Sequence, residues 1–349
     1  MCVFRREIVL LLKAPKREGA FFIFSPIIIV YEQHKKERSG YSFFASVTVP
    51  VFKMSRQNTV WLFGLIEKKA AVQTNINGDP NKSFGNLYLH VVRGVRDAHD
   101  NVNYMKHDHP LIVSMNPKIV EKMSELDPFN IVLVKGTVNT KPVSKKSTCP
   151  NCDTQNVGAG LLTYITPIFI KKIKECASYE EGLVEIIKAR ELSNQVIVTG
   201  KLIQAPKYFQ TKHGTLVTQY QIFTTRKFRV IGDNLETKTD YPWIKSYGTQ
   251  AIEDRLRLQK GSTVIVDGYI QERSVNRKTK CSCCQKIYPW QDKTMEIVPF
   301  DVEYIKDYKT DEILNLEEGK KAEDLRNELY KCCIHDEMSE DMNTDDIIN

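Results

Sequence analysis

The chain contains an internal repeat. Val60 and Gly64 recur as Val196 and Gly200. A further set recurs at nearly the same spacing: Pro110, Gly136, Cys149, Cys152 and Pro167 reappear in the same order as Pro242, Gly268, Cys281, Cys284 and Pro299. Such a repeat fixes a folding unit of about 110 residues, which is a domain and not one turn of a solenoid. The sequence therefore predicts two related domains, each with a Cys-x-x-Cys pair.

Each repeat is predicted to be mainly β. Both opening strands contain a glycine, which marks a bulge or a sharp bend. In repeat one we expect, in order, strands at 60–66 and 84–92, a helix at 116–126, a strand at 131–137, a Cys-bearing loop and a strand at 162–170. In repeat two the matching strands, helix and strands lie at 196–203, 216–224, 249–258, 262–269 and 295–304. With one more strand before the helix, this is the order of elements in an OB-fold barrel.

These elements predict the domain boundaries. Residues 54–173 and 194–307 would form two tandem OB-fold barrels, each with its Cys-x-x-Cys loop between the last two strands. The linker 174–193 contains an amphipathic helix with Leu183, Ile186 and Ile187 on its apolar face. After the second barrel come a helix within 308–335, with Leu316, Leu325 and Leu329 facing inward, and an acidic disordered tail at 336–349.

The charge is unevenly distributed. The net charge is +7, but residues 310–349 hold 13 Asp and Glu against four Lys and Arg, so the rest carries +16. A basic body favours a polyanionic partner, and the acidic tail indicates a separate role.

The segment 1–53 differs in character from the repeats. Its apolar runs fall short of the roughly 20 residues that a spanning helix needs. We interpret it as a non-native extension before Met54; a membrane anchor and an added strand or partner-binding arm are the alternatives.

Repeat two resembles the bacterial and phage single-stranded DNA-binding protein family. The resemblance covers nearly all of 194–273 and runs through Asn194-Gln-Val-Ile-Val-Thr-Gly-Lys-Leu, Lys212-His-Gly-Thr, Phe223-Thr-Thr-Arg-Lys-Phe, Ser246-Tyr-Gly-Thr-Gln-Ala-Ile-Glu-Asp and Leu258-Gln-Lys-Gly-Ser-Thr-Val-Ile-Val-Asp-Gly-Tyr-Ile. It implies a cytoplasmic protein, of a bacterium or of the bacterial host of a phage or mobile element. Such a protein coats single strands during replication, recombination and repair.

Binding of single strands without sequence preference needs basic side chains for the phosphates and flat rings on which bases stack. Repeat two offers Arg226, Lys227, Phe228, Arg229, Tyr241, Trp243 and Tyr247. The resemblance implies stacking by Phe228, Tyr241 and Tyr247. Strand alternation places Tyr241, Trp243 and Tyr247 on one face with Lys245. The alternative for each ring is a place in the barrel core.

Repeat one is poorer in these side chains. His109, Leu111 and Met115 stand where repeat two has Tyr241, Trp243 and Tyr247, although Arg93 and Arg96 add charge. We therefore expect repeat two to bind DNA more strongly. The Cys-bearing loops add Lys145 and Lys146 in repeat one and Arg273, Arg277, Lys278 and Lys280 in repeat two. A solvated charge run is the alternative.

The Cys-x-x-Cys pairs predict a zinc site. Zn²⁺ prefers four tetrahedral ligands, and each repeat supplies two. We expect Cys149, Cys152, Cys281 and Cys284 to hold one zinc that clamps the two barrels together. The alternatives are a homodimer that shares ligands between chains and no metal at all. Cys283 would be spare, and the adjacent Cys332 and Cys333 would lie at a helix end.

The remaining predictions concern partners and activity. The resemblance implies that the tail, with Asp345, Asp346, Ile347 and Ile348, docks replication and repair proteins; a tail that only aids solubility is the alternative. The chain has no phosphate-binding loop, nucleophile elbow or His-Glu-x-x-His motif. We therefore predict a binding protein and not an enzyme. An OB-fold assembly subunit of a replication or conjugation complex is the second hypothesis, and a zinc-ribbon nuclease or primase accessory is the third.

Overall fold

The computed structural model describes residues 57–96, 102–211, 214–226, 239–318, 323–324 and 326–327. Several predictions lie outside these residues: those on 1–53, on Lys227, Phe228 and Arg229, on Leu325 and Leu329, on Cys332 and Cys333, and on the acidic tail. Among the described residues, no helix has the length and apolar character that a membrane crossing would require.

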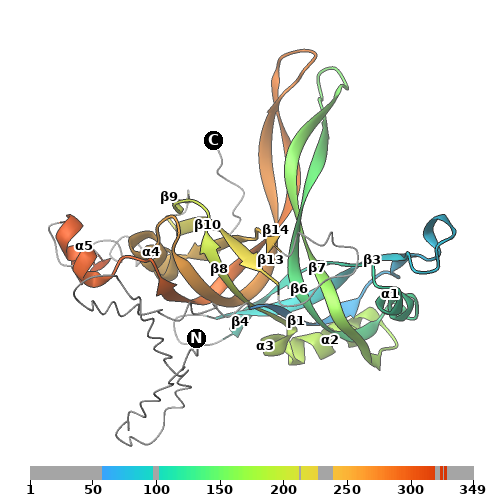
Figure 1. Ribbon diagram of the computed structural model, residues 1–349. Coiled ribbons are helices and arrows are strands. Elements are labelled where there is room, and N and C mark those ends of the chain that lie inside the picture. Colours follow the sequence, from blue (N-terminus) through green and yellow to red (C-terminus); the bar gives the residue numbers. More distant parts are fainter. Residues whose placement is uncertain are drawn as a thin grey trace, which may run out of the picture. The chain divides into compact units, whose positions relative to one another are not determined.

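The first repeat forms a closed five-stranded barrel (Figure 1). Its strands are β1 (Asn58–Ile66), β3 (Phe84–Arg96), β5 (Leu111–Ser114), β6 (Asn130–Thr148) and β7 (Gln155–Glu175), with helix α1 (Pro117–Ser124) between β5 and β6. Strand β1 pairs with β3 and β6, β3 with β5, and β6 with β7, all antiparallel; β5 and β7 close the barrel in parallel. Short strands β2 (Ala71–Gln73) and β4 (Val102–Asp108) pair with β3, and η1 (Ile76–Gly78) follows β2.

The second repeat has the same topology. Its strands are β8 (Asn194–Leu202), β10 (Leu216–Thr225), β12 (Trp243–Tyr247), β13 (Thr263–Lys280) and β14 (Ile287–Lys306), with α4 (Gly248–Arg257) between β12 and β13. The pairings of the first barrel recur, including the parallel contact of β12 with β14. Strands β9 (Lys207–Gln210) and β11 (Thr239–Asp240) flank β10. The prediction of two tandem OB folds is confirmed.

The helices follow the predicted patterns, with one error. Pro117 begins α1 behind Asn116, whose side chain accepts a hydrogen bond from the backbone N–H of Lys118. The linker contains α2 (Tyr179–Lys188) and α3 (Arg190–Ser193), and Ile186 of α2 is buried. In α5 (Asp311–Glu318), however, Leu316 is 84% exposed and Leu314 is 2% exposed, so the predicted inward face was wrong.

The two barrels join through their first strands. Strands β1 and β8 pair antiparallel, with Val60 opposite Val196. These two valines are equivalent residues of the repeats, so the junction has a local two-fold symmetry, as in an isologous dimer. Asn58 and Asn194 obey the same symmetry: each side chain bridges a backbone N–H and C=O of its own barrel, those of Val138 and Ile270.

The repeated glycines mark close backbone contacts. A Cβ atom on Gly136 would lie 2.5 Å from the carbonyl oxygen of Thr166, and one on Gly268 would lie 2.1 Å from that of Val298. Each glycine also lies at a register shift of its strand pair. The register shifts at Gly136 and Gly268 are bulges that bend the long strands, whereas the sequence predicted a bulge or bend at Gly64 and Gly200 of the opening strands.

The predicted Cys-bearing loops are mostly regular β-structure. Strands β6 and β7 stay paired up to Thr148 and Gln155, and β13 and β14 up to Lys280 and Ile287. The two hairpins project from the barrels side by side (Figure 1). We call residues 140–163 and 272–295 the first and second arm.

Candidate metal centre and nucleic-acid surface

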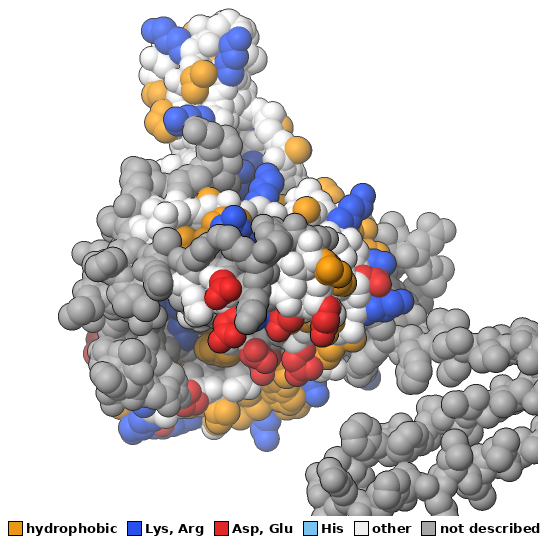
Figure 2. Space-filling model, turned by 90° about the vertical axis from the view of Figure 1, so that its left-hand side faces the viewer, with side chains coloured by type: hydrophobic (Ala, Val, Ile, Leu, Met, Phe, Trp, Pro, Cys, Tyr) orange, Lys and Arg blue, Asp and Glu red, His pale blue; other side chains and the backbone are white. Residues whose placement is uncertain are grey.

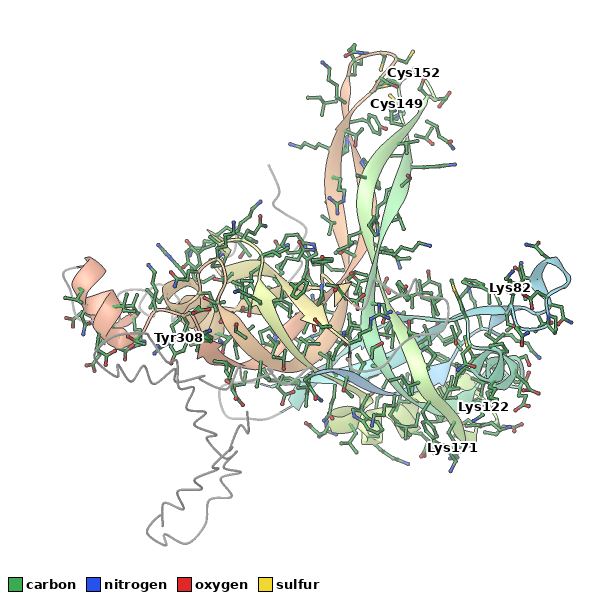
Figure 3. All side chains as sticks on the ribbon, viewed as in Figure 1. Lys82, Lys122, Cys149, Cys152, Lys171 and Tyr308 are labelled. Atoms are coloured by element: carbon green, nitrogen blue, oxygen red, sulfur yellow. The ribbon has the colours of Figure 1, made fainter. Side chains whose placement is uncertain are left out.

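The tips of the two arms bring four cysteines together. Cys149 and Cys152 lie at the tip of the first arm (Figure 3), and Cys281 and Cys284 lie at the tip of the second. The four sulfur atoms all lie within 4.8 Å of one another. The sulfur of Cys149 is 3.6 Å from that of Cys284, and the sulfur of Cys152 is 3.5 Å from that of Cys281. All four sulfurs belong to one chain.

Both tips have the same backbone conformation. The N–H of Cys149 bonds to the C=O of Thr154, and the N–H of Cys281 bonds to the C=O of Lys286. Asp153 and Gln285, which occupy equivalent positions in the two repeats, both adopt a positive φ, of 54° and 60°. The repeat thus preserves a tight turn that presents two sulfurs on one side.

The surroundings of two of the four sulfurs, those of Cys152 and Cys281, favour thiolates. A side-chain contact with Thr154 lowers the pKa of Cys152 to about 6. The backbone N–H of Cys283 and the side-chain amide of Asn156 point at the sulfur of Cys281. Asn156 also accepts a hydrogen bond from the N–H of Ser282 and donates one to the hydroxyl of Tyr288, so it connects the two arms. Cys283 itself is exposed.

Tetrahedral zinc with sulfur ligands at about 2.3 Å separates neighbouring sulfurs by about 3.8 Å. Two of the sulfur–sulfur distances, 3.5 and 3.6 Å, are close to that value. The four-cysteine cluster can therefore hold a metal ion, and its donor set fits zinc.

Two predicted phosphate contacts are ion-paired within the arms. Asp292 of the second arm, only 7% exposed at its side chain, pairs with Lys145 of the first arm and with Arg277 of its own arm. The Arg277 Nε–Asp292 Oδ2 distance is 2.6 Å. The Lys145–Asp292 pair thus joins the two arms. Because Lys145 and Arg277 both neutralise the carboxylate of Asp292, less of their positive charge is available to a polyanion.

Other basic residues of the arms face solvent. Lys146, Lys278 and Lys280 are exposed, and so is Lys141, at the base of the first arm. No ion pair involves them among the described residues. Figure 2 shows Lys and Arg side chains on the arms at the top of the view, and Asp and Glu side chains on the barrel below.

Arg226 is buried beside β11 of the second barrel. Its side chain is 3% exposed, and its Nε is 2.7 Å from Oδ2 of Asp240. The prediction placed Arg226 on a phosphate-binding surface, but burial with a paired carboxylate gives it a structural role. Asp240 also accepts a hydrogen bond from the backbone N–H of Thr140, so this pair is tied to the base of the first arm.

On the predicted stacking face of β12, Trp243 and Tyr247 are half-buried and Lys245 between them is buried. The register puts Trp243, Lys245 and Tyr247 on one side of the strand, but Lys245 is 3% exposed and its ammonium lies 3.9 Å from Glu296. Burial lowers the pKa of Lys245 to about 8. Arg273 also pairs with Glu296, at 3.1 Å, so this predicted DNA contact is engaged at the base of the second arm.

Arg93 connects the two barrels. It pairs with buried Asp108 at 2.8 Å, and its guanidinium lies 4.4 Å from the ring centre of Tyr269. Asp108 also accepts a hydrogen bond from the N–H of Glu272. Burial raises the pKa of Asp108, against the effect of Arg93. Arg96, the other predicted contact in this strand, lies in β3, and its side chain lies outside the described part.

Three exposed rings mark the outer faces of the second and third barrel strands. Phe223 of β10 is 40% exposed, and its ring centre lies 6.0 Å from that of Tyr241, which is 39% exposed. Tyr88 of β3, in the first barrel, is 58% exposed. The sequence did not identify Phe223 as a contact, whereas Tyr88 was among the rings that repeat one offers. Tyr88 pairs with Leu111, the residue that corresponds to Trp243, so repeat one carries its ring on the neighbouring strand.

Comparison with known proteins agrees with the resemblance of repeat two. Residues 193–287 match the sequence profile of the single-strand binding protein family. Single-stranded DNA-binding protein 2 of Chlorobaculum tepidum is 33% identical over 82 residues, which are 23% of this chain and 55% of that protein. The chain thus spans about half of that relative's length.

Two solved structures show a distant likeness. The wild-type single-stranded DNA-binding protein of Thermus aquaticus is 14% identical with a TM-score of 0.48, over 73% of this chain and 97% of that one. A deletion mutant of the same protein, which also carries R190A, gives 15% identity and a TM-score of 0.48, over 73% and 98%.

Proposed function

We propose, from the membership of residues 193–287 in the single-strand binding protein family, that this chain binds single-stranded DNA without sequence preference. Proteins of this family are not enzymes. The function that follows is protection of exposed single strands during replication, recombination or repair in the bacterial cytoplasm.

One observation carries the mechanism. Phe223 and Tyr241 form a pair of exposed rings on the second barrel, within the matched segment. In OB folds, the face of the second and third strands binds oligonucleotides. Stacking of a base on such a ring contributes about 1–3 kcal/mol and tolerates every base. Tyr88 offers a ring on the corresponding face of the first barrel.

The exposed lysines of the arms would bind the phosphates. The surface extends beyond the barrels through Lys141, Lys146, Lys278 and Lys280. The contribution of Lys145, Arg226 and Arg273 is indirect, because each of them neutralises a carboxylate of the protein. Because the arms are pre-ordered by their contacts, less entropy is lost when a strand binds.

Fluorescence anisotropy with labelled oligo(dT) tests the proposal. We expect the dissociation constant to be micromolar or lower at low salt and to rise with salt, because bound phosphates release counterions. Phe223→Ala with Tyr241→Ala should weaken binding by at least 10-fold, as expected from the loss of about 1–3 kcal/mol per base. Phe169→Ala, which removes a ring that is 39% exposed on β7, is the matched control. No binding at low salt would favour the assembly-subunit hypothesis.

The arm lysines have their own test. Lys146→Glu with Lys278→Glu should reduce the slope of log affinity against log salt by about 1.4, at roughly 0.7 per lost phosphate contact. Lys122→Glu with Lys171→Glu is the control, since both residues are exposed and lie far from the arm tips in Figure 3. Equal slopes for both pairs would exclude the arms from the binding surface.

We further propose that the four-cysteine cluster binds one zinc ion and clamps the arms. Purified, reduced protein should contain about one zinc per chain. Cys281→Ser should lose it, while Cys283→Ser should keep it. Zinc content that does not respond to Cys281→Ser would contradict the clamp. The docking of replication and repair proteins by Asp345, Asp346, Ile347 and Ile348 also stays a proposal.

A further inference from the structure

A second cluster of metal-binding side chains lies in the first barrel, apart from the cysteines. It consists of Glu67, directly after β1, His90 in β3, and His109, directly after β4. One ligand atom from each lies within 4.8 Å of those of the other two. Sequence spacing could not reveal it, because Glu67 and His90 come from different strands and only the fold brings them to His109.

The distances resemble those of a coordination shell. Oε1 of Glu67 is 3.0 Å from Nδ1 of His90 and 3.4 Å from Nε2 of His109. For nitrogen and oxygen ligands at about 2.0–2.1 Å from a tetrahedral ion, neighbouring ligand atoms are about 3.3 Å apart. The two measured distances lie on either side of that value.

The surroundings orient His90 as a ligand. His90 is 2% exposed, and its other nitrogen, Nε2, is 2.8 Å from Nδ1 of His107. Metal-binding histidines usually donate their second N–H to an acceptor that fixes the ring. With His107 as that acceptor, Nδ1 of His90 keeps its lone pair and faces Glu67. The hydroxyl of Tyr179, from α2, lies 3.2 Å from the same Nδ1.

The charges in the cluster favour a cation. The ion-pair partners of Glu67 in the described part of the chain are His90 and His109. A divalent ion between the three side chains would neutralise the carboxylate and use the lone pair of the buried imidazole.

We propose that Glu67, His90 and His109 form a site for a divalent transition-metal ion, zinc being the best match. Two imidazoles and one carboxylate suit zinc or a similar ion, whereas Mg²⁺ and Ca²⁺ prefer oxygen ligands alone. The ion would tie the end of β1 to β3 and to the segment after β4, beside the linker helix α2.

Cobalt substitution distinguishes this site from the cysteine site. Metal-free, reduced, untagged full-length protein is titrated with Co²⁺ and followed by absorbance. Co²⁺ at the cysteines gives thiolate charge-transfer bands; Co²⁺ at the proposed site gives weak visible bands without them. We expect two equivalents per chain, one of each spectral kind.

Variants assign the two signals. His109→Ala and Glu67→Gln should weaken the thiolate-free binding by on the order of 100-fold and leave the thiolate bands intact. Cys149→Ser should do the reverse. His213→Ala is the histidine control, and circular dichroism checks that each variant folds. Wild-type protein without a thiolate-free equivalent, or unchanged binding in both His109→Ala and Glu67→Gln, would overturn the proposal.

Discussion

Several charged side chains of this protein act inside it and not at its surface. Arg226, Lys245 and Asp254 are each less than 5% exposed, and every one has a polar partner. Removing a charge of this kind leaves its partner buried and alone, which costs more than the net contribution of the pair. The sequence showed that these residues were charged, but only the fold could show that they were buried.

Asp254 predicts a pH-dependent stability. Burial raises its pKa from the ordinary 3.8 to about 6, although hydrogen bonds from Ser246, Tyr304 and Gln250 oppose the rise. The folded protein therefore holds this proton more tightly than the unfolded chain. Its contribution to stability is complete below about pH 4 and is lost as the pH rises through about 6.

Asp254→Asn should remove this dependence. Relative to wild type, the free energy of unfolding of the variant should rise by about 3 kcal/mol between pH 4 and pH 7, because two pKa units correspond to about 2.7 kcal/mol. Urea unfolding at four pH values measures the difference. Glu303→Gln, which changes an exposed carboxylate on β14, is the control. A constant difference for Asp254→Asn would contradict the prediction.

At the scale of elements, the sequence predicted the order and identity of the strands better than their length. The strands that carry the cysteines were expected to end near Thr137 and Tyr269, yet β6 continues to Thr148 and β13 to Lys280. Polar, Lys-rich stretches look like loops because no core requires their alternation. Here the backbone pairing within each arm, and the neighbouring arm, maintain the strand.

The arm tips should lose protection when the proposed zinc ion is removed. In hydrogen–deuterium exchange, a chelator with a reductant should speed exchange of the tip amides, which include those of Cys149 and Cys281, and leave β1 and β8 unchanged. The reason is that the sulfurs of the two arms would no longer be held by one shared metal ion. Cys281→Ser should reproduce the effect without a chelator, and Cys283→Ser should not. Loss of protection throughout the barrels would show that the metal supports the whole fold.

At the scale of the whole molecule, the two barrels form one structural unit. They share the β1–β8 ladder, the contacts of Arg93 with the second barrel, and the paired arms. The repeat predicted two barrels, and the cysteine pairs predicted contact at the loops. The first-strand junction was not predicted, because pairing between distant strands leaves no periodic signal in the sequence.

We therefore expect the barrels to unfold together. Trp61 lies in β1 and Trp243 in β12, so variants that keep only one tryptophan report on each barrel separately. In each variant the other two tryptophans are replaced with Phe. Both variants should show the same shift in urea midpoint relative to wild type, and the fluorescence midpoint of each should coincide with the midpoint from its own circular dichroism. A reporter that leads its own circular dichroism curve would show that the barrels unfold independently.

The symmetric junction between Val60 and Val196 bears on whether the protein could distinguish the two directions of a DNA strand. Two identical subunits related by a dyad present the same surface from either side, so they cannot distinguish the two directions of a nucleic acid. Covalent linkage of the copies removed that restriction, because the second barrel carries Tyr241 beside Phe223, whereas His109 stands at the position of Tyr241 in the first barrel. A strand that crossed both barrels would therefore meet two different surfaces in a fixed order.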